Sequence, residues 1–274
     1  MSTLSALVTV YHRINARELD EALTSLVEQT RPADEIVIVE DGPLGAELRT
    51  LIDDFVAATP SARTVVLARN QGAGPASQAG LLTIKSEFVA RLDADDIAFP
   101  ERFATQLDFF ARHPEIDVLG TALAEFHGDT SHVVGVRTLP ETHEKLAKYA
   151  LINSPINNPS VMMRTQAVKD VGGYQSVHHM EDYDLYARLL ASGKRFHNLP
   201  EPLTYFRSSD AVFQRRTGRE MFDAERHMQR NLVHYGLISK PRAAVNLAVR
   251  TAFRLLPTTA LKRVYGALFH RRQR

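Results

Sequence analysis

The sequence contains no cysteine among its 274 residues. Disulfide bonds, thiolate metal sites and a cysteine nucleophile are therefore excluded, and a protein of a reducing compartment is expected. Long apolar runs are also missing, since none approaches the roughly 18 residues that a membrane-spanning helix needs. The first 13 residues have no basic stretch before the apolar run at 6–10, so they do not predict a signal peptide. We therefore expect a cytoplasmic protein without a spanning segment.

Acidic residues are absent from the last part of the chain. The last one is Glu225, and residues 226–274 carry eleven Lys and Arg but no Asp or Glu. Residues 1–225 carry 22 basic and 32 acidic residues, so an acidic body precedes a strongly basic tail. A tail of this kind forms either a solvated helical surface or a surface for an anionic partner.

The remaining composition is that of a folded globular protein, with 44% hydrophobic and 24% charged residues. Four short apolar runs predict buried strands at residues 4–10, 35–39, 62–67 and 88–92. The spacing of apolar residues predicts helices that follow them, at 17–28, 44–58, 76–85 and 100–113. This alternation predicts the α/β class, with a mostly parallel sheet that is flanked by helices on both faces.

The second half has a less regular pattern. It predicts strands at 122–126, 133–139, 160–163, 195–198 and 203–207, and helices at 141–151 and 181–191. The basic tail is helical throughout, with expected helices at 220–235, 243–256 and 261–271. A polar stretch at 208–219 separates the two parts, so we expect a main domain at 1–215 and a basic amphipathic helical tail at 216–274.

Polar side chains follow each of the first four predicted strands. They are Thr9 and Tyr11, then Glu40 and Asp41, then Asn70, and finally Asp93, Asp95 and Asp96. In open α/β sheets, ligands bind beyond the carboxyl ends of the strands. Because these polar groups converge on one edge of the expected sheet, together they indicate a binding site more strongly than any one of them does.

Asp93, Asp95 and Asp96 form the sharpest local signal. Three carboxylates within four residues repel one another unless a cation lies nearby, and carboxylate pairs suit hard divalent cations that also hold phosphate oxygens. The alternative is an acidic turn that caps the helix beginning at Pro100. The position at the end of a buried strand favours the metal site.

A second acidic pair, Glu181 and Asp182, opens a predicted helix after the Gly-Gly-Tyr sequence at 172–174. Acidic residues in a first helical turn are stabilised by the helix dipole, so the pair can serve the helix alone. A carboxylate held there can also act as a general base. His178 and His179 precede the pair and could supply a metal ligand, although adjacent histidines more often mark a loop.

In this order, the motifs resemble those of the family 2 inverting glycosyltransferases, which have the nucleotide-binding GT-A fold. The similar stretches are residues 8–11, 37–42, 92–96 with Pro100 and Arg102, 158–164, 172–174 and 181–182. They extend from residue 4 to about 207. Each motif alone is weak, but their combination and order are strongly specific.

The resemblance implies a role for each motif. The implied nucleotide-binding residues are Thr9, Tyr11, Glu40, Asp41, Asn70 and Asp93. Asp93, Asp95 and Asp96 are the implied ligands of Mn²⁺ or Mg²⁺, Asp182 is the implied base, and Glu181 orients the acceptor or the base. The implied reaction moves a sugar from a nucleotide-diphosphate sugar, with UDP favoured, to a hydroxyl of a saccharide or lipid-linked acceptor in cell-surface polysaccharide synthesis.

The sequence departs from the family pattern at several points. Glu40 replaces the more common Asp, and residues 76–78 read Ala-Ser-Gln where the family often has Ala-Arg-Asn. A basic contact to the diphosphate therefore has to come from elsewhere, with Arg69, Arg91 and Arg215 as candidates. Residues 214–217 read Gln-Arg-Arg-Thr, without the tryptophan that ends the corresponding motif of processive members. A non-processive enzyme is expected.

Two other functions stay open. A nucleotidyltransferase would place a glycine-rich basic loop after the first strand, but residues 11–15 contain no glycine. A non-catalytic partner of a membrane assembly would not need the Glu181-Asp182 pair.

The tail adds an amphipathic pattern to its positive charge. Its apolar residues at 261, 264, 265, 268 and 269 form one helical stripe flanked by cations. This pattern fits a helix on an anionic membrane surface, or equally one that packs on the main domain. The membrane alternative predicts a peripheral protein on the inner face of the membrane, and no nucleic-acid partner is expected.

Overall fold

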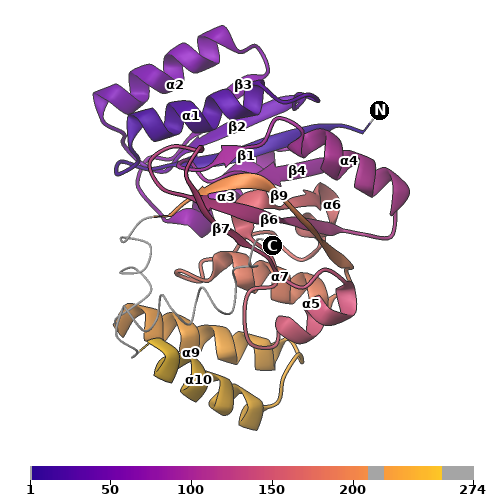
Figure 1. The fold of residues 1–274 in the computed structure, drawn as a ribbon. Helices are drawn as coiled ribbons and strands as arrows, with labels where there is room; N and C mark the ends of the chain where they lie inside the picture. Colours follow the sequence, from indigo (N-terminus) through magenta and orange to yellow (C-terminus); the bar gives the residue numbers. More distant parts are fainter. Residues whose placement is uncertain (1, 209–218, 255–274) are drawn as a thin grey trace.

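The computed structural model describes residues 2–208 and 219–254 (Figure 1). Nine strands form one sheet in the order β3-β2-β1-β4-β8-β6-β9-β5, and β7 pairs with β6. The strands are β1 (Leu4–Val10), β2 (Glu35–Glu40), β3 (Ala62–Val66), β4 (Phe88–Arg91), β5 (Ile97–Ala98), β6 (Val118–Phe126), β7 (Val133–Arg137), β8 (Met162–Arg164) and β9 (Phe196–Arg207). The helices are α1 (Ala16–Val27), α2 (Ala46–Ala58), α3 (Ala73–Thr83), α4 (Arg102–Arg112), α5 (His143–Tyr149), the 3₁₀ turn η1 (Asn158–Ser160), α6 (Thr165–Asp170), α7 (Glu181–Ala191), α9 (Arg219–His234) and α10 (Lys240–Arg254).

The predicted α/β sheet flanked by helices is confirmed. Strands β3, β2, β1 and β4 are parallel neighbours, whereas β4 and β6 each pair with β8 in the antiparallel direction. Side chains alternate between the two faces of each strand. Leu4 and Val8 of β1 therefore pack with Leu19 and Leu23 of α1, while Leu7 packs on the face that α3 and α7 cover.

Most predicted elements are present, but the second half differs in detail. The two strands expected at 195–198 and 203–207 are one strand, β9, whose pairing with β6 shifts register at two points. Helix α3 begins at Ala73, earlier than expected, and β6 begins at Val118. Strand β5, the turn η1 and helix α6 were not expected, because two, three or six residues are too few to show a periodicity.

The described part of the basic tail packs on the main domain. Met228 and Leu232 of α9 are fully buried in a cluster with Tyr183 and Ala187 of α7. Helices α9 and α10 are joined by an ion pair of 2.6 Å between Glu225 of α9 and Arg250 of α10. The Glu225 side chain is completely buried. The expected boundary at 215–216 and the helix expected at 261–271 lie outside the described residues.

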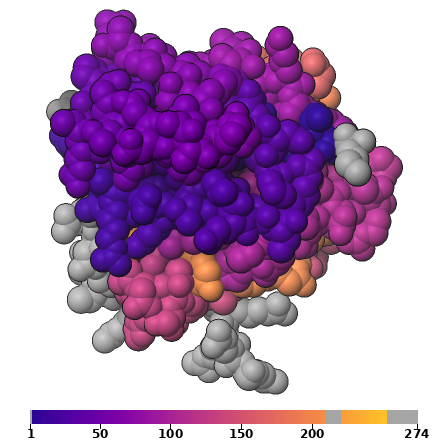
Figure 2. All heavy atoms as spheres, turned by 90° about the horizontal axis from the view of Figure 1, so that it is seen from above, coloured from indigo at the N-terminus to yellow at the C-terminus, as the bar shows by residue number. Residues whose placement is uncertain are grey.

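The N-terminal half and the α9–α10 pair lie at opposite sides of the molecule (Figure 1). Seen from above, most of the surface belongs to residues of the N-terminal half (Figure 2). Within residues 2–208 and 219–254, no helix is long and apolar enough to cross a membrane.

Candidate active site

Asp41 joins the end of β2 to the glycine-rich loop that precedes α3. Its two carboxylate oxygens accept hydrogen bonds from the backbone N–H groups of Gln71 at 2.7 Å and Gly72 at 2.9 Å. The Asn70 side chain donates to the Asp41 carbonyl at 3.2 Å. Gly42 has a φ of +85°, and a Cβ there would lie 2.8 Å from the Arg69 carbonyl carbon, so only glycine fits this crossing. Asp41 is therefore buried and holds the loop by both of its oxygens.

The other predicted nucleotide-binding residues surround this crossing. Thr9 and Tyr11 are half-buried at and just beyond the end of β1, and Asn70 is exposed. Glu40 is buried, and its carboxylate pairs with Arg49 of α2 at 2.9 Å. The structure thus brings the ends of β1 and β2 together with the loop, as the sequence predicts. It also gives Glu40 a partner on α2 that the sequence did not suggest.

Asp93 lies just beyond the carboxyl end of β4 and is one-third exposed. One carboxylate oxygen lies 3.5 Å from Nη2 of Arg91 and 3.5 Å from the side-chain amide of Asn158. Arg91 is itself buried, and its carbonyl accepts a hydrogen bond of 2.6 Å from the fully buried Arg102. Asn158 also accepts a hydrogen bond of 3.0 Å from the Tyr186 hydroxyl. Buried residues of β4, α4 and α7 therefore fix the surroundings of Asp93 just beyond the end of β4.

Asp96 has a different environment from Asp93. Its side chain is 1% exposed, and one carboxylate oxygen accepts a hydrogen bond of 2.8 Å from the backbone N–H of Arg207. Burial, together with the charges of Asp95 and Asp93, raises the pKa of Asp96 well above its usual range. Of the three predicted metal ligands, Asp96 thus has the least access to an ion outside the protein.

The carboxylates at this turn fit a divalent cation that also binds phosphate. Mg²⁺ is usually held by one or two carboxylates together with substrate phosphates and water, and Asp93 and Asp95 are both partly exposed. Across residues 2–208 and 219–254, a group of three potential ligand atoms within 4.8 Å of one another is found only at His178, His179 and Glu220, all of them exposed. Asp93 and Asp95 are not in such a group within the described residues.

Glu181 and Asp182 stand in the first turn of α7, as predicted. The Asp182 carboxylate accepts a hydrogen bond of 2.7 Å from the backbone N–H of Tyr183. A carboxylate in the first turn of a helix interacts favourably with the helix dipole. Burial and the neighbouring charge of Asp182 raise the pKa of Glu181 to about 7. The charge of Asp182 thus affects the protonation of its neighbour Glu181.

The Asp93 turn and the Glu181-Asp182 pair are about 90 residues apart in sequence, but their charges affect the pKa of the same side chains. The charge of Asp93 contributes to the raised pKa of Glu181, and Arg91 opposes it. The guanidinium of Arg91 lies 6.0 Å from the ring centre of Tyr174. Burial raises the pKa of Tyr174 to about 12, and the charges of Asp182 and Asp93 add to this effect. The turn after β4 and the start of α7 therefore form one electrostatic site.

Close glycine packing brings α3 to this site. A Cβ on Gly74 would lie 2.6 Å from the Gln175 carbonyl oxygen and 3.1 Å from Cβ of Glu181. The side chain of Gln78 accepts a hydrogen bond of 2.7 Å from the N–H of Tyr174. The Ala-Ser-Gln sequence that departs from the family pattern thus carries a residue that ties α3 to the loop before α7. In the sequence, the glycines at 72–74 and 172–173 were the only indication that α3 contacts the loop before α7.

Two of the three arginines predicted as diphosphate contacts can be placed. Arg69 is exposed on the loop beyond β3, and Arg215 lies outside the described residues. Arg91 is 3% exposed, and within the described part of the chain its Nε and Nη1 have no hydrogen-bond partner. Of the two placed candidates, Arg69 is therefore the one that an outside ligand can reach, whereas Arg91 lies buried beside Asp93.

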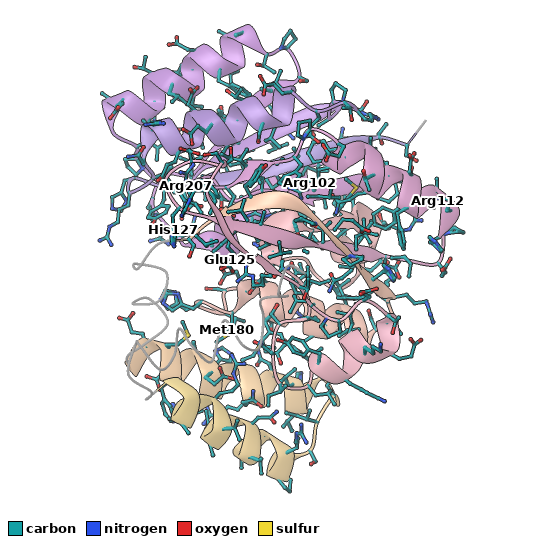
Figure 3. The ribbon with its side chains drawn as sticks, viewed as in Figure 1. Arg102, Arg112, Glu125, His127, Met180 and Arg207 are labelled. Atoms are coloured by element: carbon teal, nitrogen blue, oxygen red, sulfur yellow. The ribbon has the colours of Figure 1, made fainter. Side chains whose placement is uncertain are left out.

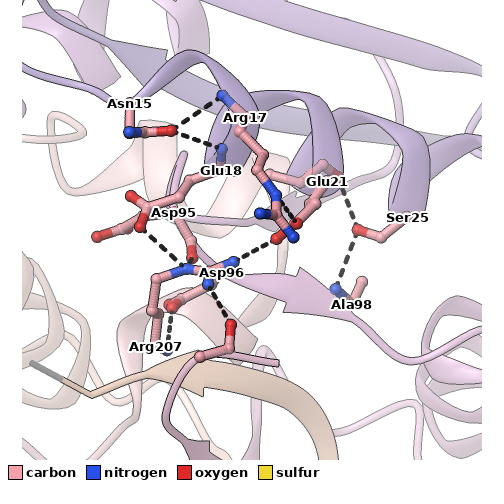
Figure 4. A network of polar contacts seen from close by, with 11 residues as sticks. Asn15, Arg17, Glu18, Glu21, Ser25, Asp95, Asp96, Ala98 and Arg207 are labelled. Atoms are coloured by element: carbon pink, nitrogen blue, oxygen red, sulfur yellow. Dashed lines mark hydrogen bonds and ion pairs between the residues drawn. The ribbon is translucent and has the colours of Figure 1, made fainter. Parts of the chain in front are cut away.

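Arg207 is a residue of the site region that the sequence did not single out as functional. Arg207 is the last residue of β9 and lies close to His127 (Figure 3). In the same view, Met180 faces the C-terminal helices. The Arg207 guanidinium contacts Asp95, Glu18 and Glu21 (Figure 4). The sequence signal for Arg207 was weak, since a single arginine after a short strand has many possible roles.

Sequence comparison gives a family. Residues 5–172 match the model of the family described as "Glycosyl transferase family 2". An uncharacterized glycosyltransferase of Haemophilus influenzae is 35% identical over 95% of this chain and 97% of its own. The amylovoran biosynthesis glycosyltransferase AmsE of Erwinia amylovora is 32% identical over 95% of this chain and 97% of its own. An Escherichia coli protein named UDP-Gal:alpha-D-GlcNAc-diphosphoundecaprenol beta-1,3-galactosyltransferase is 29% identical over 97% of this chain and 96% of its own.

Solved structures agree on the fold. TarS 1-349 of S. aureus in complex with UDP-GlcNAc has a TM-score of 0.68 at 17% identity, covering 97% of this chain and 73% of that one. The mannosyltransferase PcManGT of Pyrobaculum calidifontis, in complex with GDP-Man and Mn²⁺, has a TM-score of 0.62 at 16% identity, covering 97% and 80%. Both share the architecture described above. With more than half of its residues matched by the family model, the chain belongs to glycosyltransferase family 2.

Proposed function

We propose that this protein is an inverting, non-processive glycosyltransferase that moves a sugar from a nucleotide-diphosphate sugar, UDP-linked by preference, to a hydroxyl of a saccharide or lipid-linked acceptor. The observation that carries the proposal is the link from Asp93 through Asn158 to Tyr186 of α7, the helix whose first turn holds Glu181 and Asp182. A donor side and an acceptor side are both needed for group transfer. The UDP-sugar preference is supported by the UDP-GlcNAc complex of the structurally similar TarS and by the name of the E. coli relative.

On the donor side, Tyr11 and the crossing held by Asp41 would receive the nucleoside. Asp93 and Asp95 would hold Mn²⁺ or Mg²⁺ against the diphosphate, and the buried guanidinium of Arg91 adds positive charge 3.5 Å from Asp93. When bound, the ion stabilises negative charge on the leaving diphosphate. Asp96 supports the turn from within, because its carboxylate is buried against the backbone of Arg207.

On the acceptor side, Asp182 takes the proton from the acceptor hydroxyl. The hydroxyl oxygen forms a bond to the anomeric carbon while the bond from that carbon to the diphosphate oxygen breaks, and the nucleoside diphosphate leaves. One displacement inverts the configuration and requires no covalent enzyme intermediate. The partly buried Glu181 shares the acceptor side, where its neutral form can donate a hydrogen bond to the acceptor.

The test is transfer from a set of sugar nucleotides, with and without Mn²⁺ and with a chelator as control. We expect turnover of a UDP-sugar that depends on the metal, and a product with inverted anomeric configuration by NMR. Retained configuration would refute the single displacement, and full activity in the chelator would refute the metal site. Formation of a sugar nucleotide from a sugar phosphate would support the nucleotidyltransferase alternative instead.

The second part of the proposal concerns an anionic membrane surface as partner of the C-terminal helices, with the enzyme on the inner face of the membrane. Val245 and Val249 of α10 are 57% and 52% exposed and stand one helical turn apart. Lys240 and Arg242 are also exposed, and the chain has no acidic residue after Glu225. Cations beside exposed apolar side chains suit an anionic interface, each basic residue near it contributing about 1 kcal/mol. The residues expected at 261–271 to strengthen this contact lie outside the described part.

The contact can be tested without shortening the chain. We expect the protein to sediment with vesicles that contain phosphatidylglycerol but not with phosphatidylcholine alone, and binding should fall steeply with salt. Val245→Glu combined with Val249→Glu should reduce this binding. Val66→Glu is the matched control, since Val66 is 58% exposed at the far end of the sheet. Equal sedimentation of the double variant and the control would refute α10 as the contact.

A further inference from the structure

The Asp95-Asp96 turn is held by one residue, Arg207, through both its backbone and its side chain. The backbone N–H of Arg207 donates to the Asp96 carboxylate at 2.8 Å, and its Nε donates to the Asp95 carbonyl at 2.9 Å. Both bonds arise because β9 ends beside β5, which follows the turn directly. Two consecutive residues of the candidate metal turn are thus fixed by a residue more than 100 positions away.

The guanidinium is also anchored on its other side. Nη2 donates to the Glu21 carboxylate of α1 at 2.6 Å, and Nη1 donates to the Gly128 carbonyl at 3.2 Å. Glu18 of α1 adds an ion pair of 3.5 Å, and the guanidinium carbon lies 4.7 Å from the ring centre of Phe126. Figure 4 shows how these contacts connect α1 to the Asp95-Asp96 turn.

These contacts leave Arg207 no part in binding substrate directly. Each of its three nitrogen atoms donates inside the protein, and two carboxylates of α1 balance its charge. The side chain is 13% exposed. An arginine bonded in this way acts through the groups that it holds. Those groups belong to a turn whose three carboxylates repel one another, so the turn needs such a restraint to keep its ligands in one geometry.

We propose that Arg207 is the positioning residue of the candidate metal site, and that Glu18 and Glu21 are the anchors that keep it in place. The inference rests on the proposed metal-binding role of Asp93 and Asp95. Partners that orient metal ligands typically contribute 10- to 100-fold to metal affinity or activity. Removing the guanidinium should therefore weaken metal binding by about tenfold or more without removing any metal ligand.

Arg164 provides a matched control at the opposite end of β4. Its Nε and Nη2 donate to the Ile116 and Pro114 carbonyls at 3.0 and 3.2 Å, and its Nη1 donates to Glu87 at 3.2 Å. Its guanidinium also lies over an aromatic ring, 5.1 Å from the centre of Phe88. Arg164→Met thus removes the same kinds of contact as Arg207→Met, but far from the Asp93 turn.

The experiment is a Mn²⁺ titration of the full chain, followed by the electron paramagnetic resonance signal of the free ion, with Mn²⁺ alone and with Mn²⁺ plus UDP. Arg207→Met should raise the Kd for Mn²⁺ by about tenfold or more, while Arg164→Met leaves it unchanged. Arg207→Lys should give an intermediate Kd, because a single ammonium group cannot reproduce the fork of the guanidinium. Urea unfolding of both methionine variants controls for stability.

The outcomes separate this inference from the function on which it rests. If the wild-type chain binds Mn²⁺ and Arg207→Met binds it equally well, the positioning role is overturned while the metal site stands. If the wild-type chain binds no Mn²⁺ in either condition, both the metal site and the positioning role of Arg207 are refuted. Should Arg207→Met not fold, Glu21→Gln removes an anchor and keeps the arginine, and an unchanged Kd in that variant overturns the proposal.

Discussion

The ion pair between Arg250 and Glu225 offers a direct test of how the C-terminal helices contribute to stability. Glu225 is completely buried, and Arg250 is 18% exposed at 2.6 Å from it. Arg250→Met would remove this cation from a buried carboxylate. Breaking a buried pair by removing one partner costs about 3–5 kcal/mol. Gln229 still donates to Glu225 at 3.0 Å, so we expect the low end, about 3 kcal/mol.

The assay is urea unfolding at neutral pH, followed by circular dichroism. In a thermal melt, the same loss of about 3 kcal/mol corresponds to a fall in Tm of about 6–12 °C for a domain of this size. Arg230→Met, at an exposed position of α9, should change little. Adding Glu225→Gln to Arg250→Met should recover most of the stability, because a neutral amide costs less to bury than a charge. Equal stability of the Arg250→Met and Arg230→Met proteins would refute the reasoning.

Further predictions concern the site. Asp95→Asn should lower turnover by about 10²–10³-fold and leave the unfolding midpoint unchanged, because a charged group that faces the leaving diphosphate is lost; near wild-type transfer in Mn²⁺ would contradict the metal assignment. Asp182→Asn should lower kcat by about 10²–10⁴-fold, and the sugar-nucleotide affinity measured by calorimetry should stay almost unchanged. If Asp182→Asn has a mild effect and Glu181→Gln abolishes activity, the roles of the two residues are exchanged. Because the pKa of Glu181 is raised from 4.5 to about 7, the stability from its neutral carboxyl is present below pH 4.5 and lost as the pH rises through 7. The metal-free protein should therefore lose about 1–3 kcal/mol of unfolding free energy between pH 5 and 8; an unchanged slope in Glu181→Gln would rule this out.

The sequence predicts the first half of the fold better than the second. The parallel strands are continuous apolar runs with helices of regular spacing after them, so local pattern and final structure agree. In the second half, β9 includes Pro200 and Pro202 and changes register against β6, so its sequence resembles two short strands. Whether such a segment forms one strand depends on pairing with β6, which local sequence does not encode.

The residues of the candidate site also differ in how far the sequence could predict them. The positions of Asp93 at a strand end and of Asp182 in a first helical turn were predictable, because both follow directly from local sequence patterns. The sequence did not predict that both carboxylate oxygens of Asp41 accept hydrogen bonds from the backbone of Gln71 and Gly72. Arg207 and Gln78 could not be found, since each acts through a contact with a residue almost 100 or more positions away.

Helix α7 carries the candidate base on one side and the attachment of the C-terminal helices on the other. Asp184, two residues after Asp182, is fully buried and accepts hydrogen bonds from Asn231 at 2.7 Å and Tyr235 at 2.8 Å. Arg188 holds its other oxygen at 2.8 Å. A chimaera that takes α9 and α10 from a relative must therefore also take the matching residues at 183, 184, 187 and 188. Without them, the exchange would disturb the helix on which acceptor activation depends, even though no substrate-binding residue had been altered.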